Sequence, residues 1–387
     1  MNLAFAYENV FPERGGAETY LADLMRRLSR DQHEVHLYAV DYDADALPEA
    51  IVFHPIARTS GPRFLKPWRF AKACEQAIRL ERHDVVVGLI KTWHQDVLIP
   101  QGGLHVASAQ FNLRKYASRW MRGLAWLLQR ASLSYWSFRW LEHKQYWRQP
   151  KPWVVVPSNL VKGHLFQHYD MDAEKVRVIP NAIDPDRFTA YDRPMLRAQL
   201  RDALGIQPNE VVGLFCGHNY RLKGLGPLLQ AWMQLESPAH LLVCGGQNLH
   251  AYQRLIQQKG LADRIHFLGF VADVRQPFFA ADFLVHPTFY DPCALVTLEA
   301  LACGLPVITS AANGAAELLP PALARHVISD PHDTNCLVQH IQHFCQDAYR
   351  QTLARSARQA ALAWTFEAHY QALLTVFAEI AKRKQAA

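Results

Sequence analysis

The order of apolar runs along the chain is the feature that most restricts its fold. Short runs rich in Val, Leu and Ile alternate with longer stretches in which apolar residues recur at helical spacing. Runs that are apolar on both faces are typical of parallel strands buried between two layers of helices. In the first half, the sequence predicts strands at Asn2–Tyr7, Glu34–Val40, Asp84–Ile90 and Trp153–Pro157. In the second half, it predicts strands at Val211–Gly217, His240–Gly246, Arg264–Phe270, Asp282–Pro287 and Leu305–Ser310.

Two such series predict an α/β protein with two doubly wound, Rossmann-like domains. The length of 387 residues suffices for two domains, and contents of 50% hydrophobic and 20% charged residues are ordinary for a globular protein. Proline and aspartate cluster near residues 184–193, so we place an N-terminal domain at residues 1–188 and a C-terminal domain at residues 189–365. Residues 366–387 have the pattern of one amphipathic helix, which we expect to cross back to the first domain.

The chain contains seven cysteines, an odd number, without a Cys-x-x-Cys pair, which predicts free thiols in a reducing compartment. The first residues lack a basic leader, and no stretch of about 18 apolar residues occurs, so we expect neither a signal peptide nor a membrane span. Together these features favour a cytoplasmic location.

Two carboxylates stand in a nearly uncharged segment, Phe289–Thr309. Asp291 precedes a proline, which predicts a helix that has Asp291 as its cap and that ends at Gly304. Glu299 shares a helical face with apolar residues, and a buried carboxylate needs polar partners. Hydroxyl groups of a bound molecule would serve as such partners. The alternative is that Asp291 is only a cap and that Glu299 faces water at the edge of the helix.

The sequence offers two places for phosphate groups. The first-turn amides of the same helix, those of Ala294, Leu295 and Val296, point to whatever lies before it, which suits a phosphate. The second place is a strand end with a glycine turn, which Arg221 and Lys223 follow. These two cations would form a clamp for a diphosphate. The alternative is that both are solvated, although cations are unfavourable at the start of a helix.

The segment FYDPCALVTLEALACGLPVI, which begins at Phe289, resembles the E-x7-E signature of the family-4 retaining glycosyltransferases. The resemblance implies the GT-B fold, in which two Rossmann-like domains face a cleft, and a nucleotide-sugar donor used without a metal or other cofactor. It also implies that Asp291 contacts the sugar of the donor and that Glu299 contacts its ribose. Asp291 stands where the family usually has glutamate, and Cys293-Ala294 stands where it usually has Phe-Gly.

Further motifs carry the same resemblance. Lys223 matches the lysine that neutralises the leaving diphosphate in the family, and Arg221 would assist it. The double-glycine loop Gly15–Gly16 matches a loop that lies near the donor diphosphate and the acceptor. His105 belongs to a Gly-Gly-x-His form that resembles some lipopolysaccharide sugar transferases, in which it would lie under the sugar near the acceptor. Glu317 belongs to a loop similar to the family's GG-x-x-E and would lie near the donor.

A basic, aromatic segment completes the pattern. Residues 112–153 hold six of the ten tryptophans, and residues 112–151 hold six Arg and three Lys against a single acid, Glu142. Cations that flank Trp, Tyr and Leu on helical stretches suit an anionic membrane surface. One alternative is RNA binding through stacking and phosphate contacts. The other is a purely structural role, in which Trp and Leu pack in the core and the arginines face solvent. The expected membrane contacts are Arg114, Lys115, Arg119, Trp120, Arg122 and Trp126.

These patterns together predict a retaining glycosyltransferase that moves a hexose from a nucleoside-diphosphate sugar, a UDP-sugar foremost. The predicted acceptor is a glycolipid or a lipopolysaccharide-type saccharide at the cytoplasmic face of an anionic membrane, with no nucleic acid as partner. One alternative is a sugar-nucleotide epimerase of the same fold, which would act on the donor without a second substrate. An alternative of a different class is an RNA-binding protein that uses residues 112–153.

Overall fold

The computed structural model describes residues 1–188, 191–246 and 250–386. The chain divides into two units, one formed by residues 1–179 with 369–387 and one formed by residues 180–368. The predicted boundary after residue 188 lies later than this division, because Ile183 and Phe188 belong to the hydrophobic core of the second unit. Within the described part of the chain, no helix combines the length and the apolarity that crossing a bilayer requires. All seven cysteines are free thiols, and five of them are buried.

The first unit is built on a seven-stranded sheet in the order β5-β3-β1-β6-β7-β8-β9, in which every pair is parallel. The four strands predicted for this half are present, and three short ones were not predicted. The strands are β1 (Asn2–Ala6), β3 (Glu34–Ala39), β5 (Val52–Pro55), β6 (Val85–Gly88), β7 (Val97–Leu98), β8 (Trp153–Val156) and β9 (Val176–Val178). A separate two-stranded sheet pairs β2 (Asn9–Val10) with β4 (Asp41–Tyr42).

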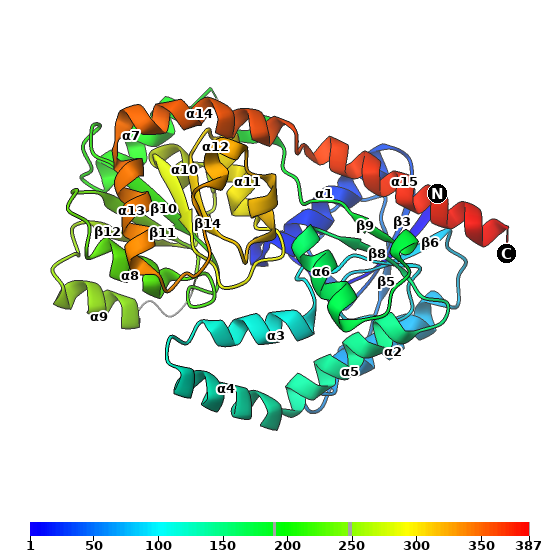
Figure 1. Cartoon of the computed structure of the whole chain (residues 1–387). Helices are drawn as coiled ribbons and strands as arrows, with labels where there is room; N and C mark the ends of the chain where they lie inside the picture. Colours follow the sequence, from blue (N-terminus) through cyan, green and yellow to red (C-terminus); the bar gives the residue numbers. More distant parts are fainter. Residues whose placement is uncertain (189–190, 247–249, 387) are drawn as a thin grey trace. The chain divides into compact units, whose positions relative to one another are not determined.

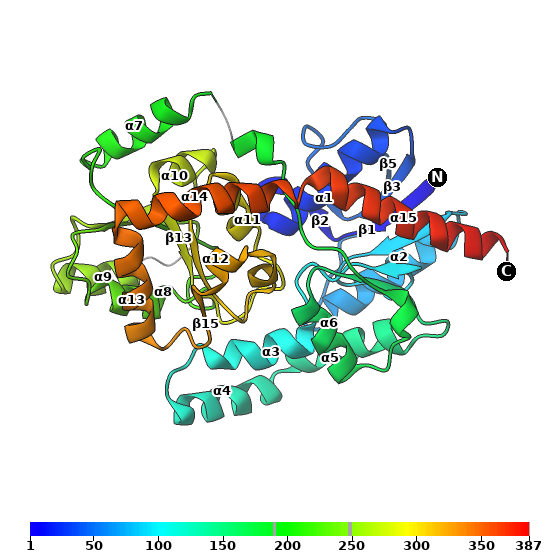
Figure 2. The ribbon, with the colours of Figure 1, turned by 45° about the horizontal axis from the view of Figure 1, so that its top comes forward.

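Helices cover both faces of the first sheet. In Figures 1 and 2, α1 and α15 lie on one side of it and α2 and α5 on the other. The α15 helix keeps contact with this unit through a hydrogen bond between the Tyr20 hydroxyl and His369 Nε2, 2.8 Å apart. The helices are α1 (Gly16–Arg30), α2 (Lys66–Ile78), α3 (His105–Arg114), α4 (Arg119–Ala131), α5 (Leu133–Trp147), α6 (Asn159–His168) and α15 (Phe366–Gln385), with 3-10 turns η1 (Pro12–Arg14) and η2 (Ala173–Lys175).

The second unit has a six-stranded parallel sheet in the order β12-β11-β10-β13-β14-β15, again between two layers of helices (Figure 1). The five strands predicted for this half are all present. The strands are β10 (Val212–Cys216), β11 (His240–Cys244), β12 (Ile265–Gly269), β13 (Phe283–His286), β14 (Val307–Ser310) and β15 (Val327–Ile328). The helices are α7 (Arg193–Ala203), α8 (Leu225–Trp232), α9 (His250–Gln258), α10 (Arg275–Ala280), α11 (Leu295–Ala302), α12 (Pro321–Ala324), α13 (Thr334–Cys345) and α14 (Asp347–Leu362), with η3 (Pro185–Phe188) and η4 (Gly314–Leu318).

The strand order places a switch point in each sheet. In the first sheet, β1 lies between β3 and β6. In the second sheet, β10 lies between β11 and β13. In each sheet, the loops after the two adjacent strands, β1 and β6 or β10 and β13, leave the sheet in opposite directions, which opens a crevice at their carboxyl ends. Ligands of open α/β sheets bind in such crevices. The loops after β1, β6, β10 and β13 are therefore where a binding site is expected.

Candidate active site

The loop between β10 and α8 brings a lysine to the switch point of the second unit. The Asn219 side chain accepts a hydrogen bond from the Leu222 amide at 3.1 Å, and the Asn219 carbonyl accepts one from the Lys223 amide at 2.9 Å. Gly224 has a φ of +83°, and a Cβ there would lie 2.0 Å from the Pro287 carbonyl oxygen. Only glycine therefore fits where this loop crosses the segment that follows β13.

Lys223 and Asp291 form an ion pair at this point. Lys223 Nζ lies 2.5 Å from Asp291 Oδ2, and the two side chains are only 19% and 14% exposed. The imidazole of His286 lies on the other side of the carboxylate, with Nε2 3.5 Å from the same oxygen. Burial alone would raise the pKa of Asp291, but Lys223 and His286 hold that pKa well below its usual range. The carboxylate is thus ionised at neutral pH, beside a cation from the neighbouring loop.

The helix that follows begins later than the sequence predicts. The predicted start at Asp291 and Pro292 is wrong, because α11 begins at Leu295 and its N-cap residue is Ala294. The cause is Asn313, whose side-chain oxygen accepts a hydrogen bond from the Ala294 amide at 3.1 Å. The Ala294 amide is thus already bonded, which contradicts its predicted use for a phosphate. The predicted end at Gly304 is confirmed, with a φ of +69°.

Asn313 fixes this segment from a distant part of the chain. It is 1% exposed, and its Nδ2 donates to the hydroxyls of Thr297 and Thr309, both at 3.0 Å. Its oxygen also accepts from the Ala315 amide at 3.0 Å. This role was not predicted, although a polar residue inside an apolar stretch is a signal for one.

Glu299 lies one turn into α11 and is half-buried. None of the described residues hydrogen-bonds its carboxylate, and burial raises the pKa of Glu299 from 4.5 to about 7 although the Arg187 charge lowers it. The amides of Leu295 and Val296, in the first turn, likewise have no acceptor among the described residues. The same helix thus offers two amide donors and a carboxylate that lacks a partner.

Two other predicted donor residues lie at the surface of the second unit. Arg221 is exposed in the turn before Lys223, and Glu317 is exposed in η4. Burial raises the pKa of the Cys293 thiol, and the charges of Asp291 and Glu317 add to that rise, which places Glu317 near the Asp291 segment. Both residues therefore belong to the loops of the switch point.

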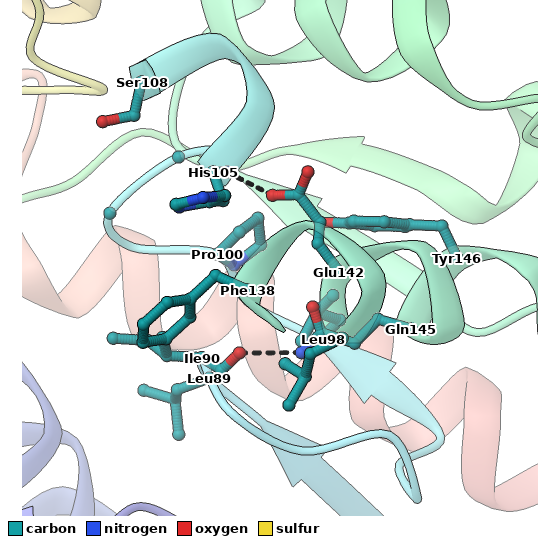
Figure 3. A pocket seen from close by; sticks show the side chains of 13 residues that line it. Leu89, Ile90, Leu98, Pro100, His105, Ser108, Phe138, Glu142, Gln145 and Tyr146 are labelled. Carbon is teal, nitrogen blue, oxygen red and sulfur yellow. Dashed lines mark hydrogen bonds between the residues drawn. The ribbon is translucent and has the colours of Figure 1, made fainter. Parts of the chain in front are cut away.

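In the first unit, His105 lies at the rim of a cavity of about 190 Å³ (Figure 3). Its ring stands 5.4 Å from that of Phe138, centroid to centroid, and its Nε2 is buried without a hydrogen-bond partner among the described residues. Burial lowers the pKa of His105, so the ring is neutral at neutral pH. The cavity lies at the carboxyl ends of β6 and β7 and is lined by Leu89, Ile90, Leu98, Pro100, Gly102, Gly103, His105, Ser108, Phe138, Leu141, Glu142, Gln145 and Tyr146.

Glu142 holds His105 in place, a role that the sequence did not reveal. Its buried carboxylate accepts hydrogen bonds from the backbone amides of His105 and Val106, the first turn of α3, as Figure 3 shows for His105. The Tyr169 hydroxyl donates to the same carboxylate at 2.6 Å. Burial raises the pKa of Glu142, although these three donors counteract that rise. The single acid of the basic segment is thus the anchor of the helix that carries His105.

The double glycine lies at the start of the first helix. Gly15 has an extended backbone with a φ of 172°, and Gly16 is the first residue of α1, so neither adopts the left-handed conformation that favours glycine. Both lie after β1, at the switch point of the first unit. A cavity of about 160 Å³ opens there, and the ion pair between Lys91 and Glu8, 2.5 Å apart, forms part of its wall.

The basic segment contains the end of α3 and the whole of α4 and α5, of which α4 is unusual. No residue of α4 is buried, and the helix contacts α3 and α5 at the outer edge of this unit (Figures 1 and 2). Large apolar side chains on α4 are exposed, with Trp120 at 75%, Leu127 at 59% and Leu128 at 64%. Leu141 and Tyr146 of α5 are instead buried, so the core-packing alternative applies to that face of α5.

The predicted membrane residues occupy different positions. Trp120 lies in the exposed apolar row of α4, and Arg119 is exposed beside it. Trp126 is also exposed, at 42%, and the Arg130 guanidinium lies 4.5 Å from its ring centroid. Arg122 Nε donates to the Tyr116 carbonyl at 2.5 Å. Arg114 and Lys115 lie over the rings of Phe111 and Tyr116, at 4.1 and 5.4 Å.

Two family models of glycosyltransferases match the chain, one over most of the first unit and one over most of the second. Residues 197–361 match the family described as glycosyl transferases group 1, and residues 14–187 match the one described as Glycosyltransferase Family 4. The lipopolysaccharide glucosyltransferase WaaG of Escherichia coli (strain K12) is 29% identical over 212 residues, 53% of this chain and 54% of that protein. The chain thus spans about half the length of this curated relative.

Solved structures share the fold over nearly the whole chain. The crystal structure of WaaG, a glycosyltransferase involved in lipopolysaccharide biosynthesis, superposes with a TM-score of 0.78 at 23% identity and covers 93% of this chain and 95% of that one. Anabaena Alr3699/HepE in complex with UDP-glucose superposes with a TM-score of 0.71 at 20% identity, over 100% of both chains. At these identities the likeness concerns the fold.

Proposed function

The chain belongs to the group 1 glycosyltransferases and has their GT-B fold, and from this premise we propose that it transfers a hexose from a nucleoside-diphosphate sugar with retention of configuration. The observation that carries the proposal is the buried pair of Lys223 and Asp291 at the switch point of the second unit. A cation and an acid side by side suit a ligand that is anionic at one end and rich in hydroxyls at the other.

The donor would use the ion pair of Lys223 and Asp291 together with groups of α11 that lack partners among the described residues. The diphosphate needs cations and amide donors, which Lys223 and the first-turn amides of Leu295 and Val296 supply. Hydroxyl groups need acceptors, which the Glu299 carboxylate supplies for the ribose and Asp291 for the sugar. Because negative charge grows on the diphosphate as the sugar leaves, Lys223 stabilises the transition state more than the ground state.

We propose UDP-glucose as the donor to test first. WaaG is named a glucosyltransferase, and HepE was crystallised with UDP, UDP-glucose, and UDP with glucose. The reaction is proposed to need no metal and no cofactor, since Lys223 and the amides would balance the diphosphate charge. His105 and the Gly15–Gly16 loop are proposed to contact the acceptor, because they lie at the carboxyl edge of the first sheet.

The acceptor is proposed to be a glycolipid or a lipopolysaccharide-type saccharide at the cytoplasmic face of the membrane. The support comes from α4, where exposed Trp120, Leu127 and Leu128 adjoin arginines. Each basic residue near an anionic surface contributes about 1 kcal/mol, so the arginines and lysines of this segment suffice for reversible attachment. Such attachment would bring a water-exposed enzyme to a lipid-linked substrate.

The test measures binding and turnover of UDP-, GDP- and ADP-sugars by thermal shift and product analysis. The double variant Lys223→Met with Asp291→Asn removes both charges of the ion pair, so no buried charge is left without a partner. It is expected to keep the fold but to abolish transfer. Lys259→Ala, a change of an exposed lysine in the same unit, is the matched control and keeps full activity. Full transfer by the doubly neutral variant would refute the proposal.

Product analysis separates the remaining functions. A glycosyltransferase releases nucleotide only in proportion to sugar moved to an acceptor or to water, whereas an epimerase converts the donor sugar without releasing nucleotide. An RNA-binding protein would leave every sugar nucleotide unchanged and would bind RNA less tightly as the salt concentration rises.

A further inference from the structure

Three side chains of the kind that bind transition metals converge at one edge of the first unit. His36 stands on β3, His54 on the edge strand β5, and Glu81 in the turn after α2. One nitrogen or carboxylate oxygen from each lies within 4.8 Å of those of the other two. The sequence does not mark these residues as a group, because they come from three separate elements.

The spacing of these atoms is close to that of a coordination shell. His36 Nδ1 lies 3.4 Å from one oxygen of Glu81, and His54 Nδ1 lies 3.5 Å from the other. Two ligand atoms bound about 2.1 Å from one tetrahedral ion are about 3.4 Å apart. Only one nitrogen of His54 can bind the same ion. Its Nδ1 faces Glu81, whereas its Nε2 lies 2.8 Å from His36 Nδ1, a distance that an ion bound to both nitrogens would increase by about 0.6 Å. Glu81 is 41% exposed and His54 20%, which leaves both free to adjust.

The neighbouring residues orient the buried histidine. Its other nitrogen, Nε2, lies 3.2 Å from a carboxylate oxygen of Glu34, within ion-pair distance but without a hydrogen bond in this structure. A carboxylate on the far nitrogen fixes the tautomer of a metal-binding histidine and makes the ligating nitrogen more basic. The ring of His36 is further held by edge contact with His83, at 4.7 Å between centroids, and His83 is in turn bonded to the Tyr38 hydroxyl at 2.9 Å. The Nδ1 lone pair of His36 is thus directed at Glu81 and His54.

We propose that His36, His54 and Glu81 bind one first-row transition-metal ion, with Zn²⁺ favoured by the two imidazoles and one carboxylate. Two nitrogens and one oxygen are typical Zn²⁺ ligands, whereas Mg²⁺ and Ca²⁺ prefer oxygen alone. The partial exposure of Glu81 leaves water access to a fourth position. Glu34 acts as a positioning residue rather than as a ligand.

The site lies away from the residues proposed for transfer. His36 is the third of six residues in β3, His54 pairs with Tyr38 within the sheet, and Glu81 precedes β6, so the cluster draws no residue from the loops that carry Gly15 and His105. An ion there would join the short edge strand β5 to β3 and to the turn before β6. Its role is therefore to stabilise the fold of the first unit, and transfer itself is expected to proceed without it.

The experiment titrates Zn²⁺ into chelator-treated full-length protein at pH 7.5, followed by calorimetry and by thermal unfolding. The wild type is expected to bind one equivalent, and an excess of about 100 times the Kd raises the Tm by about 5 to 10 °C. His54→Ala, a change at a partly exposed position, and Glu81→Gln abolish this site. Glu34→Gln weakens it about 10- to 100-fold.

The matched control is His340→Ala in the second unit. His340 also contacts another histidine, with its Nδ1 2.9 Å from His326 Nδ1, but no carboxylate completes that pair among the described residues. The His340→Ala variant is expected to bind Zn²⁺ like the wild type. Mg²⁺ is expected to shift the Tm of neither the wild type nor this variant. Absence of a Zn²⁺ effect in the wild type, or an equal effect in His54→Ala, would show that the cluster is only a hydrogen-bonded network and would overturn the proposal.

Discussion

Replacing Glu299 by glutamine should make the protein more stable and less able to bind its donor. The carboxylate is half-buried without a hydrogen-bond partner among the described residues, and burial raises its pKa from 4.5 to about 7. Glutamine has the same shape but carries no charge. Below pH 4.5 the glutamate is protonated in both the folded and the unfolded chain, so the two proteins then differ little.

The sign of the effect follows from the raised pKa. A carboxyl group with a raised folded-state pKa contributes stability that is full below pH 4.5 and that is lost as the pH rises through 7. The difference between 4.5 and about 7 corresponds to about 3 kcal/mol, most of which is lost between pH 5 and pH 8. Because Glu299 is partly exposed and Arg187 is near, we expect about 2 kcal/mol over this range.

The assay is thermal unfolding of wild type and Glu299→Gln, followed by tryptophan fluorescence at pH 5, 6, 7 and 8. The Tm of the variant should rise relative to that of the wild type by about 4 to 8 °C between pH 5 and pH 8. Glu236→Gln, at an exposed position of the same unit, shows no such trend. The variant should also bind UDP-glucose more weakly at every pH. A Tm difference that stays constant with pH would refute the reasoning, since it would mean that the carboxylate is solvated.

Three further predictions concern the other parts of the molecule. Lys223→Met alone leaves the buried Asp291 carboxylate without its cation and should lower the free energy of unfolding by about 3 to 5 kcal/mol in urea titrations, whereas adding Asp291→Asn restores most of it. Glu142→Gln should destabilise the first unit by about 1 to 3 kcal/mol and raise the KM for acceptor, because the first turn of α3 loses a charged acceptor; an unchanged Tm would contradict this. Trp120→Ser with Leu128→Ser should reduce co-sedimentation with anionic vesicles at least tenfold without affecting donor binding, whereas Trp147→Ser, an exposed tryptophan of α5, has a smaller effect; equal losses would argue against α4 as the contact.

Much of the fold could be predicted because apolar periodicity is a local property of the chain. Nine strands were placed within a few residues, since a run that is apolar on both faces has few structures open to it. Two of the strands that were not predicted, β7 and β15, have only two residues each and form because a neighbouring strand supplies their hydrogen bonds. Their existence depends on the completed sheet.

In the candidate site, too, some features follow from the local sequence and others from the tertiary structure. Residue types and spacing were enough to select Asp291, Glu299 and Lys223 as the donor-binding candidates. Which groups remain available depends on contacts between distant parts of the chain. Asn313 takes the Ala294 amide and delays the start of α11, although Asp291 and its proline are a good local start signal.

The sequence by itself determined two parallel sheets, a cation after one strand and two acids after another, because these follow from the order and spacing of residue types. Only the tertiary structure decided that Lys223 meets Asp291, that Glu142 anchors His105, and that His36, His54 and Glu81 converge. The physical reason is that strand order brings loops together, and the charge state and bonding of a side chain depend on the neighbours that it acquires in this way.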